Sequence, residues 1–396
     1  MKILVIGTGY VGLPTAILLA EAGHDVIGVD IRKEVVDSIN RGTSHIKEGG
    51  IEERLKGVVS KKLIAKQKPE EGDVFIICVQ TPMNKETKKS DMSYIKSAVN
   101  SIAPYLKRGN LVILESTVPP KTTRNIVKRM IEEKTRLNVG EDIYLVYSPE
   151  RLLPGNAFYE LVHNSRIIGG INKKSSEKAK QIFSSFIKGP VEITDDLTAE
   201  LVKLMENTYR DVNIALANEL ASVAENLGVD INHAVELANK HPRVNIHKPG
   251  IGVGGHCLPK DPWFIVETDS LNTNIIQRAR KTNDSMPRKV VEKIKNSIEG
   301  IENPRILLLG LTYKPNCDDT RNSPALEILK ILEEEGYDVV GFDPYLEDYK
   351  YSSIENVSEG ADCIALLVNH KEIKDVLENK RANILSKMNT KNILEF

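Results

Sequence analysis

Apolar runs separated by helical patterns dominate the first half of the chain. Runs typical of buried strands alternate with amphipathic stretches, and this alternation predicts a parallel sheet built of βαβ units. The strands that the pattern predicts are Ile3–Ile6, Asp25–Val29, Val74–Val79, Leu111–Leu114, Ile143–Tyr147 and Arg166–Ile168. We therefore expect residues 1–193 to form one doubly wound domain.

A long helical pattern follows this domain. Asp195 and Asp196 can cap its start, and Gly228 can end it. Apolar residues recur between them at helical spacing, which predicts one helix of about 30 residues and about 45 Å. Two shorter helices with a kink are the alternative. The helix would connect two lobes within a central helical domain, residues 194–300, and would offer an apolar face to a dimer partner.

The chain then repeats its opening pattern. Ile306–Gly310 echoes Ile3–Gly7, and Gly336–Asp343 echoes Gly23–Asp30. The repetition predicts a second sheet domain over residues 301–396. The expected fold class is thus α/β, with two Rossmann-like doubly wound domains joined by a long central helix.

Composition and charge narrow the function classes. The 396 residues contain 54 Lys and Arg against 55 Asp and Glu, and this balance argues against a mainly nucleic-acid-binding role. The four cysteines lie far apart without a CxxC pair, which argues against a zinc ribbon or a disulfide scaffold. The start runs directly into an apolar strand without a leader pattern, and no apolar run approaches the ~20 residues of a membrane span. We expect a cytoplasmic protein that binds no membrane, no nucleic acid and no metal.

A glycine-rich turn joins the first predicted strand to the first helix. Gly7, Gly9 and Gly12 form GxGxxG, and Tyr10 and Val11 complete it. Gly7 permits the tight turn, Gly9 lets a pyrophosphate approach the backbone, and Gly12 lets the helix pack closely. Because the glycines lie between a strand and a helix, they indicate a dinucleotide site, with a sheet turn that binds no cofactor as the alternative.

Polar residues at later strand ends extend this site. Asp30 ends the second predicted strand, where it can accept hydrogen bonds from an adenosine ribose. A carboxylate disfavours a 2′-phosphate and so predicts NAD, although Arg32 nearby would suit NADP. Thr81 and Thr117 follow later strands and are candidates for the nicotinamide half, with an ordinary turn or cap as the alternative for each.

Three polar residues share one face of the long helix. Lys203, Asn207 and Arg210 stand at i, i+4 and i+7. They offer donors and an amide but no acid, which suits an oxygen-rich anionic ligand. A solvated helix face is the alternative.

Four glycines precede a cysteine in the segment Gly250–Asp261. Glycines leave room for a ligand against the thiol of Cys257, and its neighbours are His, Lys and Asp rather than the apolar residues around a structural cysteine. Cationic neighbours favour the nucleophilic thiolate. A His–Cys metal site lacks further ligands at metal spacing. A thiol beside a nicotinamide site suggests a four-electron oxidation of an alcohol to an acid through a thioester.

The second sheet domain departs from the glycine pattern of the first. Gly310–Lys314 has lost the glycines, so we do not expect this domain to bind a dinucleotide. It has gained an insert with Lys314 and Arg321, which suits a diphosphate or a uridine.

These motifs together resemble the nucleotide-sugar 6-dehydrogenases, the UDP-glucose and UDP-N-acetylmannosamine dehydrogenases, over nearly the whole chain. In chain order they are GTGYVG, VQTP, ESTV, SPERLLPG, ELVKLMENTYRDVN, GVGGHCLPKD and GLTYKPNCDDTRNSP. The resemblance implies a UDP-sugar substrate, two NAD molecules reduced per sugar, and a homodimer, with a tetramer as the alternative.

The resemblance also implies catalytic roles. Cys257 would capture the aldehyde and carry the thioester. Lys203 and Asp261 would position a water or act as the base for the first oxidation. Asn207 would join them in stabilising the developing oxyanion.

Further roles follow from the same resemblance. Glu150 would activate the water for thioester hydrolysis, and Thr117 would help to hold it. Lys314 and Arg321 would contact the nucleotide sugar, and family members place that arginine across a dimer interface. Arg321 is also a candidate for the cofactor site.

The resemblance extends to the substrate. Ser148–Gly155 lacks the second acid that the UDP-glucose branch carries where Pro154 stands, and it resembles the N-acetylhexosamine branch. The implied reaction is oxidation of UDP-N-acetyl-D-mannosamine at C6, with UDP-N-acetylglucosamine ranked second and UDP-glucose third. The implied substrate contacts are Arg151, Leu152, Lys203, Asn207, Arg210, Asn213, Arg243, Asn245, Gly250, Gly254, His256, Tyr313, Lys314 and Arg321.

Two other functions remain open from the sequence. A two-electron dehydrogenase on the same scaffold would not need Cys257. A nucleotide-sugar binder without catalysis is the third interpretation. The number of NADH molecules formed per sugar separates the first two.

Overall fold

The computed structural model describes residues 1–153 and 155–396 and divides into two compact units. The first comprises Met1–Glu206 and Glu267–Asp269, and the second comprises Asn207–Val266 and Ser270–Phe396. Each unit contains its own sheet and is described by itself. The division into three domains stays a prediction, and Pro154 lies outside the described residues.

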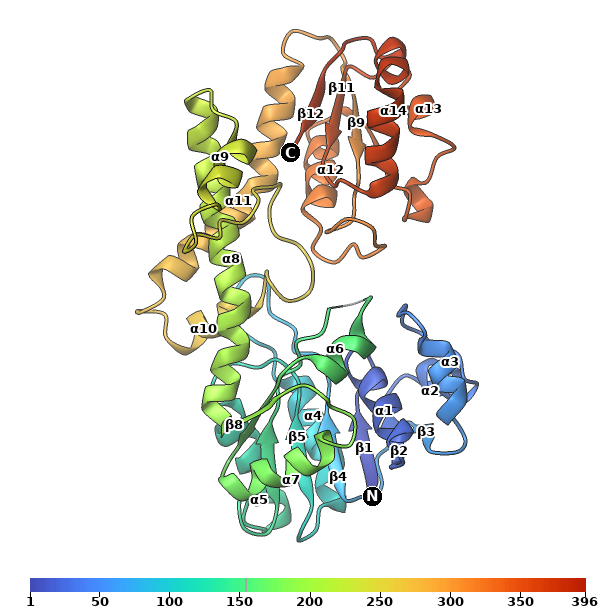
Figure 1. Ribbon diagram of the computed structural model, residues 1–396, viewed down its shortest axis with the longest axis vertical. Helices are drawn as coiled ribbons and strands as arrows, with labels where there is room; N and C mark the ends of the chain where they lie inside the picture. The colour runs from blue at the N-terminus through green and yellow to red at the C-terminus, as the bar shows by residue number, and fades with distance from the viewer. Residues whose placement is uncertain (154) are drawn as a thin grey trace. The chain divides into compact units, whose positions relative to one another are not determined.

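An eight-stranded sheet forms the centre of the described part of the first unit (Figure 1). Its order is β3-β2-β1-β4-β5-β6-β7-β8, the arrangement of a doubly wound fold. The strands are β1 Lys2–Ile6, β2 Asp25–Val29, β3 Leu63–Lys66, β4 Val74–Ile77, β5 Leu111–Leu114, β6 Tyr144–Tyr147, β7 Arg166–Gly170 and β8 Val191–Asp195. The predicted strands are confirmed, and β3 and β8 are additional edge strands.

One part of the sheet prediction is wrong. β7 runs antiparallel to β6, whereas the neighbouring pairs are parallel. The connection from β6 to β7 contains one short helix, α6 (Ala157–His163). Seven helical residues span about 10 Å, and the connection stays at the carboxyl edge of β6, so β7 starts from that edge.

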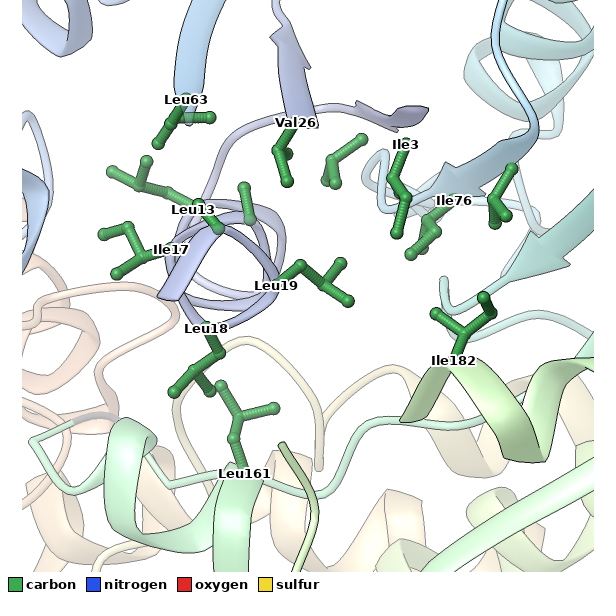
Figure 2. Close-up of a cluster of buried hydrophobic side chains, with 14 of the residues drawn as sticks. Ile3, Leu13, Ile17, Leu18, Leu19, Val26, Leu63, Ile76, Leu161 and Ile182 are labelled. Carbon is green, nitrogen blue, oxygen red and sulfur yellow. The ribbon is translucent and has the colours of Figure 1, made fainter. Parts of the chain in front are cut away.

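Helices cover both faces of this sheet, because successive strand residues point to opposite sides. Ile3 and Val5 on β1 pack into one apolar cluster, and Leu4 and Ile6 pack into the other. Figure 2 shows the first cluster, in which Leu13, Ile17 and Leu19 of α1 lie toward the strand residues and Leu18 points toward Leu161 of α6. The other helices are α1 Gly12–Glu21, α2 Lys33–Asn40, α3 Ile51–Val58, α4 Ser93–Ile102, η1 Ala103–Tyr105, the π-helix η2 Thr123–Val127, α5 Lys128–Thr135 and α7 Lys173–Phe183.

The long helix is confirmed as one continuous element. α8 runs from Asp196 to Asn226 over 31 residues. Asp195 caps its start, since the carboxylate accepts hydrogen bonds from the N–H groups of Leu197 and Thr198 at 3.0 and 3.1 Å. Gly228 follows its end with φ +68°, the left-handed conformation that ends many helices.

A second, smaller sheet lies in the second unit. Its described strands are parallel in the order β10-β9-β11-β12, which confirms the second Rossmann-like domain. They are β9 Arg305–Leu309, β10 Asp338–Phe342, β11 Cys363–Leu366 and β12 Ile393–Glu395. The helices that follow α8 along the chain are α9 Ile231–Ala238, α10 Asp261–Thr268, α11 Asn274–Ser297, α12 Pro324–Glu334, η3 Glu347–Tyr349, α13 Ile354–Val357 and α14 Lys371–Lys387. Within the described chain, none of the helices combines the length and apolar character needed to span a membrane.

Candidate active site

The glycine-rich turn between β1 and α1 has the geometry of a dinucleotide site. Gly7 adopts φ +90° and donates its N–H to the Val29 carbonyl at 2.8 Å. A Cβ at Gly12 would lie 1.9 Å from the Gly7 carbonyl oxygen, whereas a Cβ at Gly9 would meet no described atom within 4 Å. Gly9 therefore leaves the space that a pyrophosphate needs beside the start of α1, where the helix dipole favours an anion.

Asp30 lies directly after β2 and is buried. Its Oδ2 accepts hydrogen bonds from the N–H and the hydroxyl of Thr8 at 3.3 and 3.1 Å. Its Oδ1 accepts from the N–H of Arg32 at 3.1 Å, and the Arg32 Nε lies 3.4 Å away. These bonds fix the carboxylate at the strand end where a ribose binds in this fold. They also pair Arg32 with Asp30, which fits NAD better than NADP. Tyr10 and Val11 complete the turn before α1.

The two glycines give a matched test. Gly12→Ala is expected to lower the free energy of unfolding by roughly 3 kcal/mol, because the methyl group would overlap backbone. Gly9→Ala should leave the unfolding midpoint unchanged and weaken NAD binding about tenfold or more, because its methyl group stands where the phosphates approach. Thermal unfolding and calorimetric NAD titration measure the two effects. Native stability in the first variant, or native NAD affinity in the second, would contradict this interpretation of the turn.

Thr81 and Thr117 follow the neighbouring strands β4 and β5. Thr81 is buried and Thr117 is half-buried. The two strand ends are joined by Ser116, whose hydroxyl donates to the Val79 carbonyl at 2.5 Å. Both threonines thus lie at the carboxyl edge of the sheet, as expected for residues that line the nicotinamide half.

A buried arginine bridges two carboxylates beneath this edge. Arg166 on β7 donates to Glu150 and to Glu115, and its Nε donates to the Ser148 hydroxyl at 2.9 Å. The Cys78 thiol also donates to Glu115, at 3.1 Å. Burial raises the pKa of Glu115, although Arg166 opposes this shift. The guanidinium thereby holds the carboxylate of Glu150 in one orientation.

The sequence interpretation included Glu150 but missed Arg166 and Glu115. The available signal was an arginine at the start of the otherwise apolar strand RIIGG, where a charged side chain needs a buried partner. The partner could not be identified from the sequence, since Glu115 is 51 residues away along the chain.

The segment after β6 is held by α8. The Lys203 ammonium donates to the Glu150 carbonyl at 2.6 Å. Arg151 pairs with Glu206 at 2.9 Å and bonds the Ser165 hydroxyl at 3.0 Å. Leu152 packs against the apolar core of the first unit. Lys203 and Arg151 thus hold the segment that follows β6 against α8.

One helical turn further along α8, Asn207 is buried and forms contacts within the second unit. Its side-chain amide donates to the Asp261 carboxylate at 2.6 Å, and Arg210 donates to its amide oxygen. Asn207, Arg210 and Asp261 are therefore brought together. Asn213 instead bonds its own helix, donating to the Tyr209 carbonyl at 2.7 Å.

Cys257 lies at the start of the turn that leads into α10, and we call Gly250–Asp261 the cysteine loop. The Cys257 carbonyl accepts the N–H groups of Lys260 and Asp261 at 3.0 and 2.8 Å. These two bonds fix the backbone of Cys257 in the turn that precedes α10. Burial, together with the nearby cations Lys260 and Arg321, lowers the pKa of His256 to about 4. His256 is therefore neutral at pH 7 and adds no positive charge beside the thiol, contrary to our expectation.

The space over two glycines of the cysteine loop is filled by protein. A Cβ at Gly254 would lie 2.6 Å from the Tyr313 Cβ, and a Cβ at Gly255 would lie 2.9 Å from its ring. The Gly255 N–H donates to the Arg321 carbonyl at 2.8 Å, and its carbonyl accepts from the Asn322 amide at 2.9 Å. The expectation that these glycines leave room for a ligand is wrong for Gly254 and Gly255, because they let a second loop pack closely. Gly250 has no described atom within 4 Å of its Cβ position.

This second loop, Thr312–Asn322, carries both predicted nucleotide contacts and is called the Lys314 loop. Lys314 is half-buried, with its ammonium 5.6 Å from the centre of the Tyr313 ring. Arg321 is exposed and forms a bidentate pair with Asp319 at 2.9 and 2.5 Å. Burial opposes ionisation of Asp319, but hydrogen bonds from Arg321 lower its pKa below the ordinary value. Burial raises the pKa of Tyr313 to about 12.

Two further predicted substrate contacts are exposed residues of the second unit. Arg243 and Asn245 are exposed in the segment between α9 and the cysteine loop. The Arg243 guanidinium lies 3.5 Å from a ring nitrogen of His241. Among residues 1–153 and 155–396, no group of three or more His, Cys, Asp or Glu side chains is arranged to hold a metal ion.

Family models match three successive parts of the chain. They are described as the NAD binding, central and UDP binding domains of the UDP-glucose/GDP-mannose dehydrogenase family, and they match residues 1–187, 197–285 and 307–395. The first match agrees with the open space at Gly9 and the fixed carboxylate of Asp30. The cofactor is NAD.

Individual relatives are similar over the whole chain. A protein of Methanocaldococcus jannaschii named UDP-N-acetyl-D-mannosamine dehydrogenase is 49% identical and covers 100% of this chain and 91% of its own length. A Campylobacter jejuni protein of the same name is 43% identical, covering 96% and 98%. A solved structure of a UDP-D-ManNAc dehydrogenase from Pyrococcus horikoshii superposes with a TM-score of 0.94 at 46% identity, covering 100% and 95%.

Proposed function

The chain belongs to the UDP-glucose/GDP-mannose dehydrogenase family, and we propose that it oxidises UDP-N-acetyl-D-mannosamine at C6 to UDP-N-acetyl-D-mannosaminuronate. The names of the full-length relatives support this sugar. The match of residues 307–395 to a UDP binding domain supports a UDP-sugar as the substrate class. UDP-N-acetylglucosamine and UDP-glucose are the alternatives.

The proposed reaction removes four electrons from one carbon. One alcohol, one water and two NAD⁺ give one carboxylate, two NADH and three protons. Bound NAD supplies the hydride acceptor for both oxidations. Gly9 would admit its phosphates, Asp30 would bind its ribose, and Thr81 would line its nicotinamide half.

The residues of the second unit would handle the aldehyde. The Cys257 thiolate would add to the aldehyde carbon, and the resulting adduct would become a thioester after the second oxidation. Asn207, held by Asp261, would donate a hydrogen bond to the oxyanion of that adduct. Asp261 would position water or accept the alcohol proton.

Residues of the first unit would act on the thioester. Glu150, oriented by Arg166, would accept a proton from the attacking water, and Thr117 would hold that water. In the first oxidation, Lys203 together with Asp261 would position a water or act as the base. Hydrolysis breaks the carbon–sulfur bond, releases the carboxylate and restores the thiol of Cys257.

The position of Cys257 at the start of a helical turn carries the four-electron interpretation, because a two-electron dehydrogenase needs no thiol. We expect two NADH per UDP-N-acetyl-D-mannosamine consumed. The test measures NADH absorbance against sugar consumption in a panel that adds UDP-N-acetylglucosamine, UDP-N-acetylgalactosamine and UDP-glucose. One NADH per sugar would rule out the thioester route. A preference for another sugar in the panel would contradict the proposed substrate.

A homodimer is part of the proposal. α8 exposes an apolar stripe whose members recur at helical spacing. Its members are Leu201, Met205, Tyr209, Leu216 and Val223. Exposed apolar stripes of this length mark interaction sites, and light scattering would give the mass of the assembly. The cytoplasmic location stays a prediction from composition, which cell fractionation would test.

A further inference from the structure

The second sheet reproduces the strand-end geometry of the dinucleotide site. Gly310 follows β9 as Gly7 follows β1, and each glycine donates its N–H to the neighbouring strand at 2.8 Å. Asp343 follows β10 as Asp30 follows β2. The Asp343 Oδ2 accepts the N–H of Leu311 at 2.7 Å, as the Asp30 Oδ2 accepts that of Thr8.

A histidine fills the place beside Asp343. His370 and Asp343 are both 0% exposed, and the His370 Nε2 lies 3.0 Å from the Asp343 Oδ2 and 3.2 Å from the Thr312 hydroxyl. In the first sheet, the residue that corresponds to Thr312 is Gly9, which leaves open space. The Thr312 side chain thus stands where Gly9 leaves the space that a pyrophosphate needs. This is a physical reason to expect no dinucleotide at the second sheet.

The hydrogen bonds of His370 assign its tautomer. Its Nδ1 accepts the backbone N–H of Asn316 at 2.9 Å. Because Nδ1 is an acceptor, the ring proton resides on Nε2, which donates to the Asp343 carboxylate. The two ring nitrogens therefore have separate roles: Nε2 bonds Asp343 at the end of β10, and Nδ1 bonds a loop.

That loop is the Lys314 loop, and it is fastened at Asn316 from two directions. Asn316 adopts φ +58° and is exposed. Its side-chain oxygen accepts the N–H of Lys371, the first residue of α14, at 2.9 Å. Asn316 thus bonds His370 through its backbone and Lys371 through its side chain. Lys314 lies two residues before this anchor, and Arg321 five residues after it.

We propose that His370 is a positioning residue for nucleotide-sugar binding: through the Asn316 N–H it fixes the Lys314 loop in the conformation that binds the UDP group. The inference rests on the proposed function, in which Lys314 and Arg321 contact the UDP-sugar. Asp343, at the strand end that corresponds to that of Asp30, supports the anchor by bonding His370 Nε2. Because His370 is fully buried, it would act through Asn316 rather than by direct contact with the nucleotide sugar.

Two substitutions separate the roles of the ring nitrogens. In His370→Gln the amide N–H₂ can still reach Asp343, but the acceptor for the Asn316 N–H is lost. In His370→Asn the amide oxygen can still accept that N–H, but Asp343 loses its donor. We expect His370→Gln to weaken UDP binding and raise the KM for UDP-N-acetyl-D-mannosamine by about fivefold to tenfold, with kcat and the KM for NAD within about twofold. His370→Asn should lower the unfolding temperature and keep UDP affinity.

The measurements are calorimetric titration with UDP alone, steady-state kinetics and thermal unfolding. Tyr345→Phe is the matched control, because its ring still packs against His370 and only the exposed contact of its hydroxyl with Glu372 is lost. Loss of UDP affinity in proportion to lost stability in both histidine variants would show a merely structural role and overturn the proposal. An equal rise in the KM for NAD would overturn it as well.

The titration with UDP keeps this inference distinct from the proposed function. If the wild-type protein oxidises none of the sugars but His370→Gln still loses UDP affinity, the reaction is wrong and the positioning role stands. A wild-type protein that binds no UDP would overturn both. Should His370→Gln fail to fold, Asn316→Gly tests whether fastening at position 316 sets the UDP affinity: it keeps the backbone N–H bond to His370 but removes the side-chain bond to Lys371, at an exposed residue whose positive φ suits glycine. It should weaken UDP binding about threefold, and unchanged affinity would count against the anchor.

Discussion

Replacing Cys257 with serine is expected to lower sugar-dependent NADH formation by at least roughly 10³-fold. A serine hydroxyl at the start of the turn into α10 stays protonated, so it captures the aldehyde poorly. The variant should therefore release at most one NADH per sugar, and slowly. Absorbance of NADH under single-turnover and steady-state conditions measures both quantities.

Cys363→Ala is the control for this substitution. It removes a thiol from β11, within the apolar core of the second sheet, and leaves the cysteine loop unchanged. It should retain normal turnover. Two NADH per sugar at a normal rate from Cys257→Ser would refute the role of the thiol, while inactivity of both variants would point to lost folding.

The largest expected loss of stability comes from Arg166→Met, at about 3–5 kcal/mol in the free energy of unfolding. Methionine fills similar space but leaves the carboxylates of Glu115 and Glu150 buried without their shared cation. Urea unfolding monitored by circular dichroism measures the loss. Adding Glu115→Gln to this variant should recover part of it, because one buried charge is then removed.

Arg108→Met is the surface counterpart of that change. Arg108 pairs with Asp142 and is largely exposed, so its loss should cost less than about 1 kcal/mol. If Arg166→Met were as mild as this control, the bridge between the two carboxylates would contribute little to the fold. If the double variant recovered nothing, the loss would reflect the shape of the side chain rather than its charge.

The fold was largely predictable because buried strands require long apolar runs. β1, β4, β5 and β6 are covered on both faces and are almost wholly apolar, so each was found. β8 at the edge is mostly exposed and its sequence is partly polar, so the apolar pattern did not predict it. The reversed direction of β7 left no trace in its sequence, because residue periodicity is the same for both directions.

The candidate site was predictable where local geometry restricts the residue type. The turn at Gly7 and the contact at Gly12 exclude side chains, so the glycines themselves reveal the site. Arg166 with Glu115, and His370 with Asn316, depend on partners that are distant in the chain. Single polar residues of this kind look ordinary in a sequence, and their role follows only from which strand ends the fold brings together.

The contact of Gly254 and Gly255 with Tyr313 sets a limit on engineering. The cysteine loop and the Lys314 loop occupy each other's space to within a methyl group, so neither can change its shape alone. If one loop is replaced by that of a relative with a different sugar preference, the new loop will clash with the native loop that remains or leave a gap beside it. Libraries that seek a new substrate should therefore vary both loops as a single cassette, and a change at position 254 should be selected together with one at position 313.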